Sequence, residues 1–60
     1  MRDWLLFLRK KQELSQQEVA ERCGISRQYY GLIEQGKRNV SVKIAKAIAS
    51  VFGFDWRRFF

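Results

Sequence analysis

Arginine and glutamine stand side by side at Arg27 and Gln28, directly after Ser26. Serine is a preferred residue at the start of a helix, so this pair is expected in a first helical turn. Arginine forms bidentate hydrogen bonds with guanine, and glutamine forms them with adenine. A helix that enters the major groove of DNA presents its first turn to the base edges. Arg27 and Gln28 therefore have the chemistry and the position to read base pairs.

The same predicted helix has an unusual outer face. Helical spacing places Tyr30 and Ile33 on one side, so Gln28, Gly31 and Leu32 point away from that side. Glycine weakens a helix by about 1 kcal/mol relative to alanine, but it lets another molecule approach the backbone closely. A leucine here can contact a thymine methyl group. The alternative is a solvated face with an incidental leucine, and we favour base reading because the face has no acidic residue.

Residues around this helix are suited to contacts with phosphate groups, which position a protein on DNA without reading its sequence. Helix N-termini attract anions because their first amide hydrogens are free, and Gln16 is expected at the start of the preceding helix. The loop after the helix is basic, although solubility alone would also explain its composition. The Tyr29 hydroxyl either reaches a phosphate or its ring only packs. The predicted phosphate-contacting residues are Gln16, Ser26, Tyr29, Lys37, Arg38 and Asn39.

Helical segments are predicted along the whole chain, and no segment shows the alternating pattern of a strand. The predicted helices span residues 2–11, 15–23, 26–35, 41–52 and 55–60. Ser15 and Glu18 form a capping-box motif at the second of them. The predicted caps are Ser15, Ser26, Ser41 and Asp55 at helix starts, and Gly24, Gly36 and Gly53 at helix ends. The fold class is therefore all-α.

Apolar residues at helical spacing predict which side of each helix faces the core. The predicted inner residues are Met1, Trp4, Leu5 and Leu8; Gln16, Val19, Ala20 and Cys23; and Val42, Ala45, Ile48, Ala49 and Phe52. Trp56 and Phe59 are expected to complete the core against the first helix. The remaining apolar residues, more than one small domain can hide, are Leu6, Phe7, Phe54 and Phe60. A two-fold dimer would cover them, so we expect self-association through this surface.

Length and composition exclude several classes of site. A chain of 60 residues forms one domain, residues 1–60, and the sequence has one cysteine and no histidine. Disulfide scaffolds and zinc sites within the chain are therefore excluded. No carboxylate pair or phosphate-cradling loop appears, and the serines are explained as caps, so we predict no enzymatic activity, cofactor, metal or small-molecule ligand. Cys23 is expected to be a small core residue, with a redox role left open.

The charge balance indicates an anionic partner. Twelve lysines and arginines against six acidic residues give a net charge of +6. The apolar run WLLFL is too short to span a membrane, and no signal-peptide cleavage pattern follows it. We therefore expect a cytoplasmic protein. A basic protein bound to a membrane surface is a weaker alternative, suggested by WLLFLRKK, and it would become helical only with anionic lipid.

Several short motifs together resemble the lambda-repressor-like, Cro/repressor or XRE-family helix-turn-helix domain. The matching motifs are LR at residues 8–9, LSQQEVA at 14–20, GIS at 24–26, IEQGKRN at 33–39 and GFDW at 53–56. The resemblance extends without gaps over nearly the whole chain. It implies a compact five-helix DNA-binding domain that usually acts as a dimer on a two-fold operator.

The resemblance also implies roles for individual residues. Gln16 matches a glutamine that contacts a phosphate and supports the reading helix, and Arg27, Gln28 and Leu32 match base-facing positions. Lys37 and Arg38 match loop positions that contact the DNA backbone. Arg9 and Glu34 match a pair joining the first and third helices, which we expect to be partly buried. Val40 stands where many members have proline, and the change is expected to loosen the loop.

These observations predict a sequence-specific double-stranded DNA-binding protein without a membrane partner. We expect a transcriptional regulator, a repressor that acts as a dimer by occupying promoter DNA in the nucleoid of a prokaryote or phage host. An antitoxin or a restriction-modification controller with the same DNA-binding face is the alternative within this class. A protein-interaction module that keeps the fold without binding DNA is a further alternative.

Overall fold

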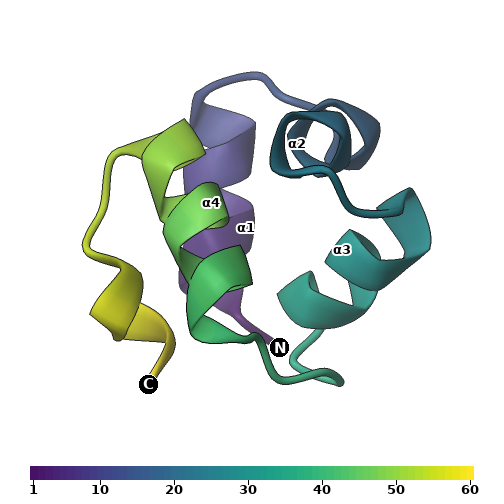
Figure 1. Ribbon diagram of the computed structural model, residues 1–60. Coiled ribbons are helices and arrows are strands. Elements are labelled where there is room, and N and C mark those ends of the chain that lie inside the picture. The colour runs from purple at the N-terminus through teal and green to yellow at the C-terminus, as the bar shows by residue number, and fades with distance from the viewer.

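The computed structural model describes residues 1–60 as four α-helices followed by one turn of 3-10 helix (Figure 1). The elements are α1 (Asp3–Lys11), α2 (Gln16–Cys23), α3 (Arg27–Glu34), α4 (Val42–Phe52) and η1 (Trp56–Phe59). The predicted all-α class is confirmed. The last predicted helix, residues 55–60, is a single turn of 3-10 helix over Trp56–Phe59, with Asp55 as its cap as predicted.

The predicted caps explain where the elements begin and end. Ser15 accepts a hydrogen bond from the Glu18 amide at 3.1 Å, and Glu18 accepts one from the Ser15 amide at 2.9 Å, which completes the capping box. The side chains of Ser26 and Ser41 cap α3 and α4 in the same manner. The predicted helices begin one residue early because they included these caps. Gly24, Gly36 and Gly53 all have the left-handed backbone expected of them.

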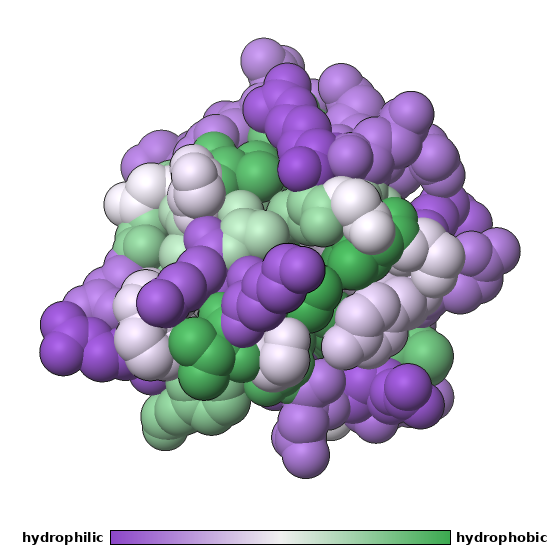
Figure 2. Space-filling model, in the orientation of Figure 1, coloured by the Kyte–Doolittle hydropathy of each residue, from purple (hydrophilic) through white to green (hydrophobic).

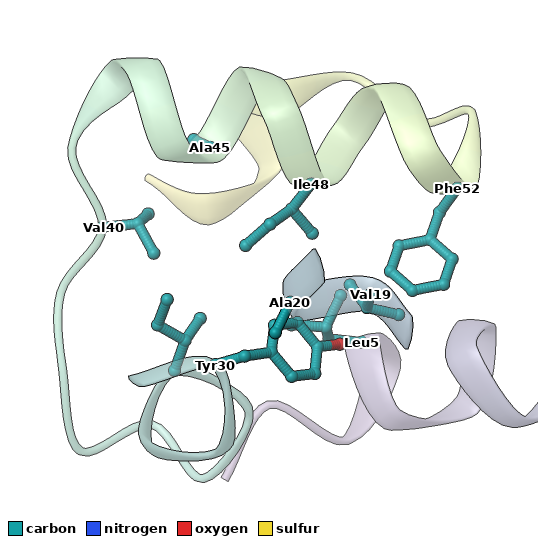
Figure 3. Packing of buried hydrophobic residues seen from close by; sticks show 9 residues of the cluster. Leu5, Val19, Ala20, Tyr30, Val40, Ala45, Ile48 and Phe52 are labelled. Atoms are coloured by element: carbon teal, nitrogen blue, oxygen red, sulfur yellow. The ribbon is translucent and has the colours of Figure 1, made fainter. Parts of the chain in front are cut away.

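The core lies between α4 on one side and α1, α2 and α3 on the other (Figure 3). Its buried apolar residues are Leu5, Val19, Ala20, Tyr30, Ile33, Val40, Ala45, Ile48 and Phe52. Two predicted inner residues were wrong: Met1, which precedes α1, is 72% exposed, and Val42 is 47% exposed. Val40 takes the place of Val42 in the core. Val40 precedes the extended Ser41 cap, and its side chain points into the core (Figure 3). Val40 is thus a core residue rather than a substitution that merely loosens the loop.

A cluster of aromatic rings closes the core at the C-terminal end. The Trp4 ring lies edge-on to the rings of Phe54 and Phe59, with centroid distances of 5.2 Å in both cases. Phe59 completes the core as predicted, and Trp56 is half-buried beside Phe60. Phe54 was expected on the free apolar surface, but it is half-buried in this cluster because Trp4 and Phe59 cover it.

The remaining predicted surface residues differ in exposure. Phe7 is 64% exposed and Phe60 is 71% exposed, whereas Leu6 is half-buried. Of the four residues predicted to form a free apolar surface, only Phe7 and Phe60 are therefore largely exposed. None of the helices has the length and apolar character needed to cross a membrane.

Candidate nucleic-acid interface

Helices α2 and α3 form a helix-turn-helix, joined only by Gly24, Ile25 and Ser26 (Figure 1). The αL conformation of Gly24 ends α2, and the extended conformation of Ser26 begins α3. This short connection fixes the angle between the two helices and leaves one side of α3 free of other elements. Such a helix has the arrangement of a reading helix in DNA-binding proteins.

Helix α3 divides into an inner face and an outer face. Tyr30, Ile33 and Glu34 are buried. Arg27 and Gln28 in the first turn are exposed, and Leu32 is 36% exposed. Three of the predicted base-reading residues thus lie on the outside of α3, whereas the fourth, Gly31, is half-buried beside the Gln16 side chain of α2. The position of an apolar leucine among them fits contact with a partner that has its own apolar groups.

The inner face of α3 carries an acidic residue that another helix neutralises. Arg9 Nε donates to Glu34 Oε2 at 2.8 Å, and Arg9 Nη2 donates to Glu34 Oε1 at 3.0 Å. The two side chains are 12% and 3% exposed, which confirms the predicted partly buried pair. Burial is the largest influence on the pKa of Glu34 and raises it, but the polar neighbours of the carboxylate, with Arg9 first among them, together hold that pKa below its ordinary value. The pair therefore fixes α3 to α1 in its charged form.

Gln16 connects the first turn of α2 to the same carboxylate. Its Nε2 donates to Glu34 Oε1 at 3.3 Å, and its side chain is half-buried. Gln16 therefore supports α3, as the resemblance implied, and its contact with a phosphate remains a prediction. The Tyr30 hydroxyl is buried nearby without a hydrogen-bond partner. Burial, and after it the neighbouring Glu34 carboxylate, raise the pKa of Tyr30, so this phenol stays protonated.

The loop after α3 presents basic side chains next to the outer face of that helix. Lys37, Arg38 and Asn39 are all exposed. The Arg38 guanidinium lies 5.7 Å from the centroid of the half-buried Tyr29 ring, a cation–π distance. Packing of the Tyr29 ring is thereby confirmed, and a contact between its hydroxyl and a phosphate remains a prediction.

Charge is unevenly distributed over the molecule. From Ser26 to Lys46 the only acidic residue is Glu34, which Arg9 neutralises. The basic residues in this range are Arg27, Lys37, Arg38, Lys43 and Lys46. Figure 2 shows hydrophilic residues along much of the upper and right margins, on the side where α2 and α3 lie in Figure 1. The outer side of α3 and its flanking loop therefore form a surface that attracts anions.

Other reactive groups do not gather into a site. No three side chains of the His, Cys, Asp or Glu type lie close enough together to hold a metal ion. Cys23 is half-buried against the core, as predicted, and burial raises the pKa of its thiol. The thiol is therefore less reactive at neutral pH than a free cysteine.

Sequence reasoning missed Arg2. Its side chain donates to the carbonyl groups of Ile33 and Arg38, at the end of α3 and in the loop that follows. No local pattern pointed to these contacts because they join residues that lie more than 30 positions apart.

Comparisons with known proteins agree with this geometry. Residues 5–59 match the helix-turn-helix family. The uncharacterised HTH-type transcriptional regulator YqaF of Bacillus subtilis is 45% identical over 60 residues, covering 100% of this chain and 79% of the relative. A regulator of the same description from Methanocaldococcus jannaschii is 40% identical over 53 residues, covering 88% of this chain and 80% of the relative. No solved structure is significantly similar.

The family match covers α2, the turn and α3, and it includes most of α1 and all of α4 and η1. A further HTH-type regulator, from Archaeoglobus fulgidus, is 40% identical over 52 residues, which are 87% of this chain and 73% of the relative. The similarity thus includes the elements that hold the reading helix as well as the helix itself. The chain therefore belongs to the XRE-type helix-turn-helix family of DNA-binding transcriptional regulators.

Proposed function

We propose that this protein is a repressor that binds a two-fold operator as a dimer, with α3 of each subunit in the major groove. Arg27, Gln28 and Leu32 contact base edges, and Lys37 and Arg38 hold the flanking phosphates. The protein acts in the cytoplasm, on the nucleoid, and lowers transcription by occupying promoter DNA without an enzymatic step. The exposed positions of these residues and the absence of free acid beside them support this proposal.

The observation that carries the proposal is the glycine in the middle of α3. A Cβ at Gly31 would have the Gln16 Oε1 atom as its nearest neighbour at 3.6 Å, an ordinary van der Waals contact. The fold therefore accepts alanine at this position, and alanine would favour the helix by about 1 kcal/mol. Nothing within the protein explains the glycine. We attribute it to the close approach of a DNA backbone or base edge along the side of α3 on which Gln16 lies.

The dimer is supported by the apolar surface that remains free. Phe7 on α1 and Phe60 after η1 expose most of their rings, and half-buried Leu6 and Phe54 lie in the same two segments of the chain. Exposed aromatic residues of this kind are typical of interfaces. A two-fold dimer that covers them would place two copies of α3 about 34 Å apart, one turn of DNA.

The test is a measurement of affinity on two kinds of duplex. Sites are first selected from random DNA, and binding to a selected and a scrambled duplex is then followed by fluorescence anisotropy over a range of salt. Gln28→Ala should cost about 1–3 kcal/mol on the selected duplex and little on the scrambled one. Lys37→Ala should weaken both equally and lower the salt slope by roughly one unit for each phosphate that the variant no longer neutralises. Arg58→Ala removes a positive charge on η1 and serves as the control.

If Gln28→Ala, like Lys37→Ala, weakened binding to both duplexes equally, α3 would be a basic anchor rather than a reader. Repression is tested separately, with a reporter gene whose promoter contains the selected site. Expression of the protein should lower the reporter signal, and Gln28→Ala should restore it. A rise in the reporter signal with the parent protein would show that it activates transcription, which would contradict the proposed repression.

A further inference from the structure

Arg2 joins three parts of the chain that are distant in the sequence. Its backbone N–H donates to the Glu34 carbonyl at 2.8 Å, and its Nη1 donates to the Ile33 carbonyl at 2.5 Å and the Arg38 carbonyl at 3.1 Å. Its guanidinium also lies 5.4 Å from the centroid of the Phe59 ring. One side chain thus connects the end of α3 and the following loop to η1.

Helix α3 has no charge of its own to stabilise its C-terminal end. Its last turn contains no basic residue, and its first turn contains no acidic residue. The free carbonyl groups at a helix C-terminus carry partial negative charge, which a nearby cation stabilises. The Arg2 guanidinium supplies that cation from outside the helix. The N-terminal end of α3 keeps its partial positive charge on the side of Arg27 and Gln28.

The basic loop depends on the same residue. The Lys37 amide donates to the Leu32 carbonyl at 2.9 Å, so this bond joins the loop only to the helix that precedes it. The bond from Arg2 to the Arg38 carbonyl is the one hydrogen bond that joins residues 37–39 to another element of the fold. The Arg38 backbone is therefore anchored while its side chain stays exposed.

We propose that Arg2 is a positioning residue for DNA binding, which acts by holding the Arg38 backbone so that Lys37 and Arg38 face the phosphates. This inference rests on the proposed function. A loop that is ordered before binding loses less conformational entropy when it meets the DNA, so the contact is stronger. In this role Arg2 acts through Arg38 and does not itself touch the DNA.

The first test needs no DNA. Backbone order parameters of residues 37–39 are measured by NMR in the parent, Arg2→Ala and Arg58→Ala. Arg58 is the matched control, because its guanidinium lies 4.5 Å from the Trp4 ring centroid and makes no hydrogen bond. Order should fall at residues 37–39 in Arg2→Ala alone. Unchanged order in Arg2→Ala, or an equal fall in Arg58→Ala, would overturn the proposal.

The second test measures affinity for the selected and scrambled duplexes. One phosphate contact contributes roughly fivefold to tenfold at 0.1 M salt, so Arg2→Ala should weaken binding to both duplexes by up to about this factor. In a background that carries both Lys37→Ala and Arg38→Ala the additional loss should be less than about twofold, because the side chains that Arg2 positions are already absent. The same loss in the parent and in this background would show that Arg2 acts independently of the loop, which overturns the proposal.

A milder variant keeps the proposal testable if Arg2→Ala does not fold. Arg2→Lys retains the charge and the aliphatic stem but lacks the planar donor fork, so the loop should show intermediate order and intermediate affinity. Parent-like order and affinity in Arg2→Lys would reduce the role of Arg2 to its charge and contradict the proposal. Failure of the proposed function is recognised separately, because the parent protein would then bind selected and scrambled DNA equally.

Discussion

The buried ion pair between α1 and α3 makes a strong prediction for stability. Glu34→Ala would leave the Arg9 guanidinium, 12% exposed, with the Leu14 carbonyl as its remaining hydrogen-bond partner. Removing one partner of a buried pair costs about 3–5 kcal/mol, because the other charge is stranded. A core of this size supplies about 3–5 kcal/mol in total. We therefore expect Glu34→Ala to be largely unfolded at 25 °C, as measured by circular dichroism and urea denaturation.

The control is Arg57→Ala, which breaks the other ion pair. Arg57 Nη2 lies 2.7 Å from Asp55 Oδ2, but the two side chains are 75% and 54% exposed, so water screens the pair and the melting temperature should hardly change. A double variant, Arg9→Met with Glu34→Leu, should be more stable than Glu34→Ala because no charge is stranded. A melting temperature for Glu34→Ala within a few degrees of the parent would refute the reasoning.

Three further changes test other parts of the molecule. The neighbours of Glu34, with Arg9 first among them, hold its folded-state pKa below its unfolded value, so its contribution to stability is full above that value and is lost as pH falls. The urea-measured stability of the parent should therefore fall between about pH 5 and pH 3, and the Arg9→Met, Glu34→Leu double variant should lose less over this range. Gly31→Ala should raise the melting temperature by about 4–8 °C yet weaken binding to the selected duplex, and unchanged binding would remove Gly31 from the interface. Phe60→Asp should yield a monomer in sedimentation, whereas a parent protein that is monomeric with and without DNA would exclude the dimer.

Local interactions made most of the fold predictable from the sequence. Helix caps such as Ser15 and Ser41 act within one turn, so a short motif defines them. The exchange of Val42 for Val40 in the core could not be predicted by periodicity, because Val40 precedes the helix and its direction depends on the path of the loop. The position of Phe54 depends on rings contributed by α1 and η1, which no local pattern reveals.

The candidate site was predictable to the extent that helical geometry decides it. Spacing alone separated the outer residues Arg27, Gln28 and Leu32 from the inner residues of α3. The Arg9–Glu34 pair could be expected only through resemblance to a family, since its partners come from different helices. Arg2 was missed because its partners are backbone carbonyl groups, which any residue provides, and sequence therefore carries no signal of them.

The division of α3 into two faces has a consequence for how such regulators diversify. Tyr30, Ile33 and Glu34 hold the helix in the fold, and surface substitutions away from such positions usually change stability by less than about 0.5 kcal/mol. The outward positions 27, 28 and 32 can therefore mutate freely without unfolding the domain, and position 31 tolerates a Cβ. Duplicated copies of one gene can in this way acquire different operators within a few mutations. Because the outward positions of α3 tolerate substitution, this helix is also a practical place to engineer regulators that do not bind one another's operators.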